Sequence, residues 1–453
     1  MNNADSSYDH EQYNKRLMGN IVRMPLVAGH ARGAHLEIAP IDGGEMRSIL
    51  DFWGDEGVAS LGYNSDEFRM AMAEFLNAEL PQRLPDVYPH ELRWKAAEII
   101  CSRTGMDRLF YSNSGTEANE AAIKLARKYW WDKEASEGNP GFGEAYPQLK
   151  NCARRHKIYT IEGNFHGRTG YSLAASDYRV SPYHRTGYGV SAPGFGVITD
   201  DLREVAFDCQ EMPGTNEPDW SKVAAVMLAP VLGNNLVKTY PQSFWERLDQ
   251  LRKQHGVLLV YDDVQAGNGR AGHYATWQKH GVKPDIMSLS KGIAMGLPMS
   301  VTLASEEVAK SFATPGVHFN TFGGTLLCCH LAIKLYEWLD EHIHEVRHRG
   351  DLIRENFGAR SWVKHFDGSG MLNAFQPDFK QFGYDGYQFI ARSRENGLAL
   401  VTHRQYGMIR FTPPLNVSAS DLQEAFNILD QTHKQLAAEA AADSEKLGMG
   451  EVG

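Results

Sequence analysis

The chain has 453 residues, of which 42% are hydrophobic and 23% are charged, and its formal net charge at pH 7 is −10. These values are typical of a globular protein of two or three domains, and the negative charge disfavours nucleic acid or an anionic membrane as a partner. The polar start Met1–His10, the absence of a long apolar run and an odd count of five cysteines predict a cytoplasmic protein with reduced thiols.

Residues 1–65 are expected to be a small segment with some β structure, including a strand near Ser48–Trp53. From about residue 107 to 310, apolar runs of strand length alternate with helical patterns, which favours a wound, mostly parallel sheet. Residues 131–156 are expected to be a surface insertion and residues 172–220 to be rich in loops. Strands are expected at 107–111, 157–161, 223–228, 257–261 and 285–290, and helices at 67–80, 89–101 and 243–255.

A turn with small hydroxyl residues, Ser114-Gly115-Thr116, follows the first of these strands and precedes a strongly helical segment. Free backbone N–H groups and hydroxyls at a helix N-terminus suit a phosphate. Ser114 and Thr116 could equally serve as simple helix caps. The turn alone therefore leaves both interpretations open.

Two further loops are rich in glycine. The loop 162–169 places Phe165, His166 and Arg168 around two glycines, and the alternative is an ordinary turn with an exposed arginine. The loop 318–325 carries Thr321 and leads into a helix expected at 326–342. Helices at 343–357 and 420–440 should belong to a second, smaller domain, with a frayed tail from Ala441 to Gly453.

Two buried strands end in residues of opposite charge. The run 257–261 is followed by Asp262 and Asp263, and the run 285–290 is followed by Lys291. Ligands of open α/β sheets bind beyond the carboxyl ends of such strands, where both groups would lie. Pyridoxal 5'-phosphate (PLP) needs a lysine for its Schiff base and an acid beside its pyridine nitrogen. The alternative is two strands that end in ordinary surface charges.

The segment His344-Glu345-Val346-Arg347-His348 matches the HExxH pattern of zinc peptidases. Its surroundings are charged on nearly every face, and nothing singles out a third ligand, although Glu355 could be nominated. A solvated helix face is the favoured interpretation, so no metal site is expected.

Taken in order, these motifs resemble the class III, fold-type I PLP-dependent aminotransferases, a family that includes ornithine, acetylornithine, 4-aminobutyrate and diaminobutyrate transaminases and glutamate-1-semialdehyde aminomutase. The resemblance covers roughly residues 20–435. The motifs are SNSGTEANEAAIKLAR (112–127), EGNFHGRT (162–169), VLLVYDDVQAGNGRAG (257–272), PDIMSLSKG (284–292), FNTFGGT (319–325) and IRFTPPL (409–415).

The resemblance implies an α/β fold with a large domain around a mostly parallel seven-stranded sheet and a smaller α+β domain built from both termini. The expected division is 1–65 for the N-terminal segment and pocket wall, 66–315 for the PLP-binding domain, 316–345 for an interface loop and linking helix, 346–440 for the C-terminal small domain and 441–453 for the tail.

The resemblance also implies roles for individual residues. Lys291 would form the internal aldimine and shuttle a proton, its pKa lowered by nearby positive charge and by aldimine formation, and Asp262 would pair with the pyridine nitrogen. Thr321 would reach the phosphate in the neighbouring subunit, which implies an obligate homodimer with shared active sites. The other cofactor contacts implied are Ser114, Gly115 and Thr116 on the phosphate, Phe165 and Val264 on the two ring faces, Gln265 near the phenolic oxygen, and His166.

Substrate recognition is the part that the family resemblance leaves open. Arg168 would take a distal carboxylate and Arg410 an α-carboxylate, which suits glutamate or 2-oxoglutarate in a ping-pong transamination, while Trp53 would line the pocket. The family's masking glutamate is absent, because Ala229 and Asn234 stand in the matching motif. Arg410 is therefore expected to be unmasked unless another acid reaches it. An aminomutase or amino-acid racemase on the same scaffold is the alternative function, and the amino donor stays open.

Overall fold

A computed structural model gives the structure over residues 18, 24, 26–41, 43–136, 154–177, 179, 182–185, 192–214, 216–233, 237–402 and 407–449. Within these ranges, no helix is long and apolar enough to cross a membrane. The cysteines that fall in them, Cys101, Cys209, Cys328 and Cys329, are free.

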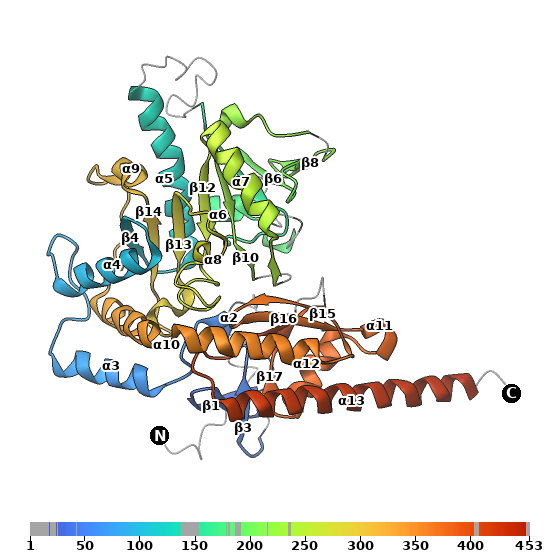
Figure 1. Cartoon of the computed structure of the whole chain (residues 1–453). Helices are drawn as coiled ribbons and strands as arrows, with labels where there is room; N and C mark the ends of the chain where they lie inside the picture. The colour runs from blue at the N-terminus through green and yellow to red at the C-terminus, as the bar shows by residue number, and fades with distance from the viewer. Residues whose placement is uncertain are drawn as a thin grey trace.

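A nine-stranded sheet forms the centre of the larger domain (Figure 1). Its order is β4-β14-β13-β12-β9-β5-β6-β7-β8. The strands from β13 to β6 run parallel, whereas β14 is antiparallel to both of its neighbours. The predicted seven-stranded, mostly parallel sheet corresponds to β4 through β6, and the antiparallel pair β7 and β8 extends its edge within the region expected to be loop-rich. The bounds are β4 Arg108–Ser112, β5 Lys157–Ile161, β6 Phe195–Ile198, β7 Glu204–Phe207, β8 Gln210–Glu211, β9 Val223–Leu228, β12 Leu258–Asp262, β13 Ile286–Leu289 and β14 Ser300–Ala304.

Helices cover both faces of this sheet, which explains why β9, β12 and β13 are buried at every position and mostly apolar. Alternate residues of a strand point to opposite faces. Leu228 and Tyr261 accordingly share a core cluster with Phe244 of α7, whereas Met227 and Val260 share a second cluster with α5. The helices of this domain are α3 Asp66–Asn77, α4 Glu91–Thr104, α5 Gly115–Ser136, α6 Gly170–Ala175, α7 Gln242–His255, α8 Trp277–His280 and α9 Glu306–Ala309, and the short strands β10 Val231–Leu232 and β11 Lys238–Thr239 form a separate pair.

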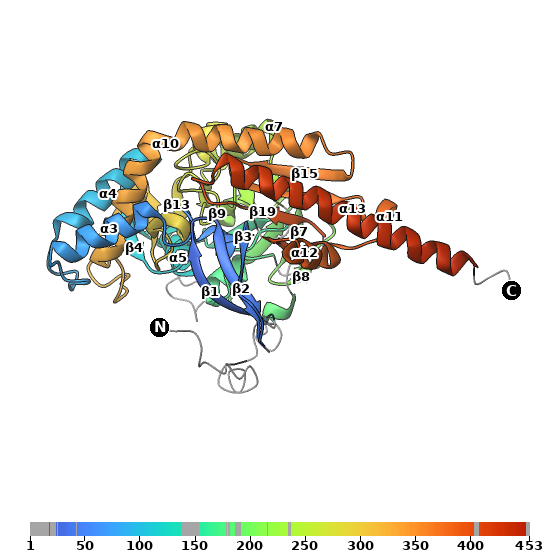
Figure 2. The same ribbon diagram turned by 90° about the horizontal axis from the view of Figure 1, so that it is seen from below.

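Both ends of the chain build the smaller domain, as the family resemblance implies (Figure 2). One four-stranded sheet joins the N-terminal strands to the C-terminal half, because β17 pairs in parallel with β3. A second sheet has the order β15-β16-β19-β18. The bounds are β1 Leu26–Arg32, β2 His35–Pro40, β3 Arg47–Asp51, β15 Val363–Ser369, β16 Leu372–Pro377, β17 Leu398–Ala399, β18 Val401–Thr402 and β19 Ile409–Phe411, with helices α11 Phe379–Phe382, α12 Gly386–Glu395 and α13 Ala419–Met449.

Two predictions about the long helices are wrong. Residues 326–358 form one helix, α10, where two helices meeting at 342/343 were expected. No proline or glycine interrupts the helix at that point, and its Gly350 packs against the backbone of Gly370. The helix α13 continues to Met449, through most of the tail expected to be frayed, since the alanine-rich stretch from Ala437 to Ala442 favours helix.

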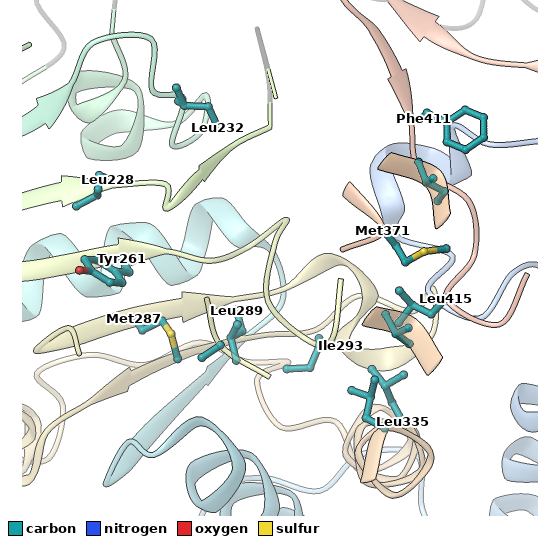
Figure 3. Close-up of a cluster of buried hydrophobic side chains, with 14 of the residues drawn as sticks. Leu228, Leu232, Tyr261, Met287, Leu289, Ile293, Leu335, Met371, Phe411 and Leu415 are labelled. Atoms are coloured by element: carbon teal, nitrogen blue, oxygen red, sulfur yellow. The ribbon is translucent and has the colours of Figure 1, made fainter. Parts of the chain in front are cut away.

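A single core cluster extends from the large sheet into the smaller domain. Figure 3 shows Leu289 and Ile293, from the end of β13 and the turn after it, with Leu335 of α10 and with Met371 and Leu415 of the C-terminal region. This shared core holds the carboxyl ends of β12 and β13 against the smaller domain, so residues from both domains meet at that edge.

Candidate active site

The carboxylate of Asp262 is held by a set of buried donors at the end of β12. Its Oδ2 accepts a hydrogen bond from His166 Nδ1 at 2.7 Å and from Asn119 Nδ2 at 2.8 Å. Its Oδ1 accepts the backbone N–H of Val264 at 3.2 Å. The other ring nitrogen of His166, Nε2, lies 2.9 Å from the hydroxyl of Thr160. These contacts orient the carboxylate and fix the imidazole that supports it.

The next residue, Asp263, has a different task. It points to the opposite face of β12, where its carboxylate accepts the backbone N–H of Thr276 at 2.7 Å and its hydroxyl at 2.9 Å. Burial raises the pKa of Asp263 to about 7. Of the two acids that end this strand, Asp262 is therefore the one available at the sheet edge.

Lys291 lies at the same edge, because Ser288 pairs with Asp262 and Lys291 comes three residues later. Its backbone has φ +49, a left-handed conformation that L-residues rarely adopt. The turn is secured by Ser60, whose hydroxyl donates to the carbonyl of Gly292 at 3.0 Å. Burial lowers the pKa of Lys291 to about 8; Glu56 opposes this shift and Arg410 adds to it. The expected lowering is present, although burial is a larger cause than positive charge.

The turn before α5 is closely packed against the residues after Asp262. A Cβ atom on Gly115 would lie 2.7 Å from Val264 Cγ1, so any larger residue there would have to displace the Val264 side chain. A Cβ on Gly167 would lie 2.4 Å from Thr116 Oγ1, which brings the loop 162–169 to the same place. The hydroxyl of Ser114 caps α5 by accepting the N–H of Glu117 at 3.3 Å. The helix N-terminus with its hydroxyls therefore lies beside Val264, two residues from Asp262.

Arg410 reaches this edge from the smaller domain. It belongs to β19, keeps only 5% of its surface exposed, and forms an ion pair between Nη1 and Glu56 Oε2. The same carboxylate oxygen lies 4.0 Å from Lys291 Nζ. Trp53 donates its indole N–H to Glu56 Oε1 at 3.3 Å, and Gln265 Nε2 donates to the Glu56 carbonyl at 3.3 Å. Glu56 thus lies among four of the predicted site residues: Lys291, Arg410, Gln265 and Trp53. The sequence patterns did not single out Glu56 itself.

The profile of the family described as Aminotransferase class-III matches residues 20–432, nearly the whole chain. The chain belongs to the class III aminotransferases. It is 30% identical over 440 residues to the acetylornithine aminotransferase of Mesorhizobium japonicum, covering 95% of this chain and 99% of that protein. It is 29% identical to the acetylornithine aminotransferase of Aquifex aeolicus, covering 91% of this chain and 98% of that protein.

Solved structures share the fold. The ornithine aminotransferase of Toxoplasma gondii superposes with a TM-score of 0.79 at 24% identity, over 96% of this chain and 97% of that chain. An amine transaminase from an uncultivated Pseudomonas species, solved in its PLP-bound form, superposes with a TM-score of 0.73 at 21% identity, over 91% and 95% of the two chains. The resemblance to the class III family is therefore confirmed, with its fold-type I architecture and its PLP-dependent transaminase chemistry.

The residues at this edge fit the cofactor of a class III aminotransferase. Lys291 supplies a partly neutral amine, and the turn 114–116 offers backbone N–H groups and hydroxyls to a phosphate. Among the described residues, Asp262 Oδ1 accepts one hydrogen bond, from the backbone N–H of Val264 at 3.2 Å. This oxygen can therefore also accept a pyridinium N–H. We therefore take these residues as the ones that would hold PLP. His166 differs from them, because it contacts the Asp262 carboxylate and supports it through a hydrogen bond.

Other predicted residues lie at the margin of this group. Arg168 is exposed; its guanidinium lies over the ring of Phe165, 5.1 Å from the centroid, and its Nε lies 3.3 Å from His184 Nε2. Thr321 is exposed on the loop before α10. Ala229 is buried just after β9, while Asn234 lies outside the described residues. The roles assigned to Arg168, Phe165 and Thr321 stay predictions.

The HExxH segment lies within α10, where both His344 and His348 are exposed and Glu345 pairs with Arg349. Among the residues that the structure describes, no group of three or more His, Cys, Asp or Glu side chains is arranged to hold a metal ion. The two histidines lie on the exposed side of the helix, whereas Val346 between them is buried.

Sequence patterns missed two residues of the site. Asn119 lies inside the SNSGTEANE motif, one helical turn after Gly115, so its direction toward Asp262 could have been inferred from helix periodicity. Glu56 could not be placed in this way, because it comes from a turn more than 200 residues before Lys291. Its only local signal is a pair of acids, Asp55 and Glu56, between Gly54 and Gly57.

Proposed function

We propose that this aminotransferase moves an amino group from an amine donor to a 2-oxo acid in two half-reactions that share one site. The 2-oxo acid that we propose is 2-oxoglutarate. The observation that carries the proposal is the position of the Glu56 carboxylate between the Arg410 guanidinium and the Lys291 amine. A carboxylate fits there, beside the amine that does the chemistry. The α-carboxylate of the oxo acid can take the same place and bind Arg410 through charge-assisted hydrogen bonds.

Each residue at the edge has a defined task in this proposal. PLP, when bound, supplies the electron sink for the bond that breaks at the substrate carbon. Lys291, with a pKa of about 8, can accept a proton at Nζ and return it near neutral pH. Asp262 offers Oδ1 to the pyridine N–H, while His166 and Asn119 keep its carboxylate oriented.

The donor that we propose carries its reactive amine away from its own α-carboxylate. The names of the relatives, acetylornithine aminotransferases, point to such side-chain amines. The pairing of Arg410 with Glu56 is compatible with a donor that does not need this arginine. Arg168, exposed at the margin beside Phe165, is the residue that we assign to a distal carboxylate.

We further propose that two copies of the chain form a homodimer with shared active sites. Thr321 lies between two exposed aromatic residues, Phe319 (63% exposed) and Phe322 (64%). Asn320 ties this loop to the strand before the phosphate turn, because its Nδ2 donates to the Tyr111 carbonyl at 2.8 Å. An apolar loop so close to the site is suited to a subunit contact that brings Thr321 to the partner's phosphate.

A single-turnover scan of amines tests the proposed function. The protein loaded with PLP is mixed with one amine at a time, and the visible absorption of the lysine-bound cofactor is followed. A transaminase loses that absorption with its donor and regains it only after a 2-oxo acid is added. Exchange of an α-proton without loss of the amino group would instead indicate an amino-acid racemase, and regeneration without any oxo acid an aminomutase.

The acceptor is tested separately with Arg168→Ala. If Arg168 takes the distal carboxylate, the substitution weakens the reaction with 2-oxoglutarate far more than the reaction with pyruvate, which has no distal carboxylate. Equal effects on the two acceptors would refute the assignment of Arg168.

A further inference from the structure

Glu56 lies in a turn with an unusual backbone. The segment Gly54–Gly57, labelled α2, is not a right-handed helix, because φ is +57, +49, +62 and +84 at its four residues. Two of these residues, Asp55 and Glu56, are not glycine and pay for a conformation that L-residues avoid. Asp51 holds the start of the turn, since its Oδ1 accepts the N–H groups of Trp53 at 2.8 Å and Gly54 at 3.0 Å.

This backbone directs the Glu56 carboxylate inward. One oxygen pairs with Arg410 and lies 4.0 Å from Lys291 Nζ, and the other accepts the indole N–H of Trp53 at 3.3 Å. The two partners of the ion pair differ in solvent exposure. The Glu56 side chain is 35% exposed, whereas the Arg410 side chain, on a strand, is 6% exposed. Glu56 can therefore leave toward solvent, while Arg410 stays in place.

We propose that Glu56 is a displaceable counter-ion, which covers Arg410 while the amine donor reacts and gives way to the carboxylate of the 2-oxo acid. This proposal rests on the proposed function, in which Arg410 binds that carboxylate. Loss of a carboxylate partner from a buried arginine is costly, and the carboxylate of the oxo acid offsets that cost when it takes the place of Glu56. The acid thus comes from the N-terminal turn, in place of the motif at 229–235.

The exchange is a competition between two anions. Burial alone raises the pKa of Glu56, but the charges of Arg410 and Lys291 outweigh it and lower the pKa to about 2. Glu56 therefore stays ionised at neutral pH and repels any second carboxylate at the same place. Because the oxo acid must displace it, the affinity for the acceptor is lower than Arg410 alone would give.

The test measures binding rather than turnover. The PLP form cannot pass an amino group to 2-oxoglutarate, so calorimetric titration of that form gives a dissociation constant without reaction. If Glu56 covers Arg410 in about nine molecules of ten, Glu56→Gln lowers this constant about tenfold. The matched control is Asp55→Asn, which removes the neighbouring exposed charge from the same turn and leaves the constant unchanged. Glu56→Gln should also raise kcat/KM for glutamate relative to a side-chain amine donor by a similar factor.

Three outcomes are distinguishable. An unchanged dissociation constant in Glu56→Gln, with a normal circular dichroism spectrum, overturns the proposal. Binding of 2-oxoglutarate that survives Arg410→Ala refutes the acceptor site of the proposed function itself. If Glu56→Gln does not fold, Trp53→Phe removes only the indole donor that holds the carboxylate; it must then tighten 2-oxoglutarate about twofold or more, and wild-type binding in that variant overturns the proposal.

Discussion

The hydrogen bond from His166 to Asp262 can be tested with two variants that each keep a polar group near only one of the two ring nitrogens. In His166→Gln the side-chain amide takes roughly the place of Nε2, near Thr160, and the donor to Asp262 Oδ2 is lost. In His166→Asn the amide takes roughly the place of Nδ1, so the donor to Asp262 is kept and the contact with Thr160 is lost. The pair of variants separates the support of Asp262 from the packing of the loop.

The expected size follows from the contacts. His166 Nδ1 is 2.7 Å from the carboxylate, and both residues are nearly fully buried. A hydrogen bond to a charged group contributes about 1.5–3 kcal/mol, which corresponds to about 10- to 150-fold in a binding constant. Because Asn119 remains as a second donor at 2.8 Å, we expect the lower half of that range.

The assay is the titration of cofactor-free protein with PLP. His166→Gln should weaken PLP binding by about 10- to 30-fold, and His166→Asn by about threefold or less. If both variants bind PLP like the wild type, Asp262 does not depend on His166. If both are equally weak, the loss comes from packing of the loop 162–169 and the hydrogen-bond argument is refuted.

Three further predictions follow from the structure. Gly115→Ala should weaken PLP binding about tenfold or more in the same titration, because its Cβ would lie 2.7 Å from Val264 Cγ1. Burial lowers the pKa of Lys291 from 10.5 to about 8, so the folded apo-protein binds fewer protons than the unfolded chain between these pH values. The unfolding free energy of the apo-protein relative to Lys291→Met should therefore rise by about 3 kcal/mol from pH 8 to 10.5, measured by urea unfolding. Replacing both Phe319 and Phe322 by serine should weaken the dimer about 100-fold in analytical ultracentrifugation.

Each of these has a contradicting result. Wild-type PLP affinity in Gly115→Ala would show that the phosphate turn has room for a methyl group. A pH-independent difference between wild type and Lys291→Met would show that the amine titrates normally. The control is Met212→Ser, which changes an exposed residue at a distant site. If the double serine variant dimerises as tightly as this control, the subunit contact lies elsewhere.

The five strands expected in the large domain are present as β4, β5, β9, β12 and β13, because such strands depend on local composition, whereas β6, β7, β8 and β14 were not expected individually. Fully buried strands such as β9 and β12 are short apolar runs, and the residues just after them lie at one edge by the geometry of parallel sheets. Asp262 and Lys291 follow from that rule. The break expected inside α10 was wrong, because no proline or glycine stands at 342/343 to end the helix.

The contact that matters most for substrate choice could not be predicted. Arg410 was expected to be unmasked unless another acid reached it, because the family's masking glutamate is missing from the motif at 229–235. The structure places Glu56 on it, from a turn whose left-handed backbone depends on Asp51 and on two glycines. No local pattern indicates where such a turn directs its side chains, since the partners lie more than 200 residues apart in the sequence.

The central claim is that Lys291 is the residue that carries the cofactor. The most direct measurement is reduction of the PLP-loaded protein with borohydride, followed by proteolysis and mass spectrometry of the labelled peptide. The account predicts a pyridoxyl phosphate group on Lys291, in the peptide that follows β13, and no label in Lys291→Ala. A label on any other lysine, or one that persists in Lys291→Ala, would contradict it.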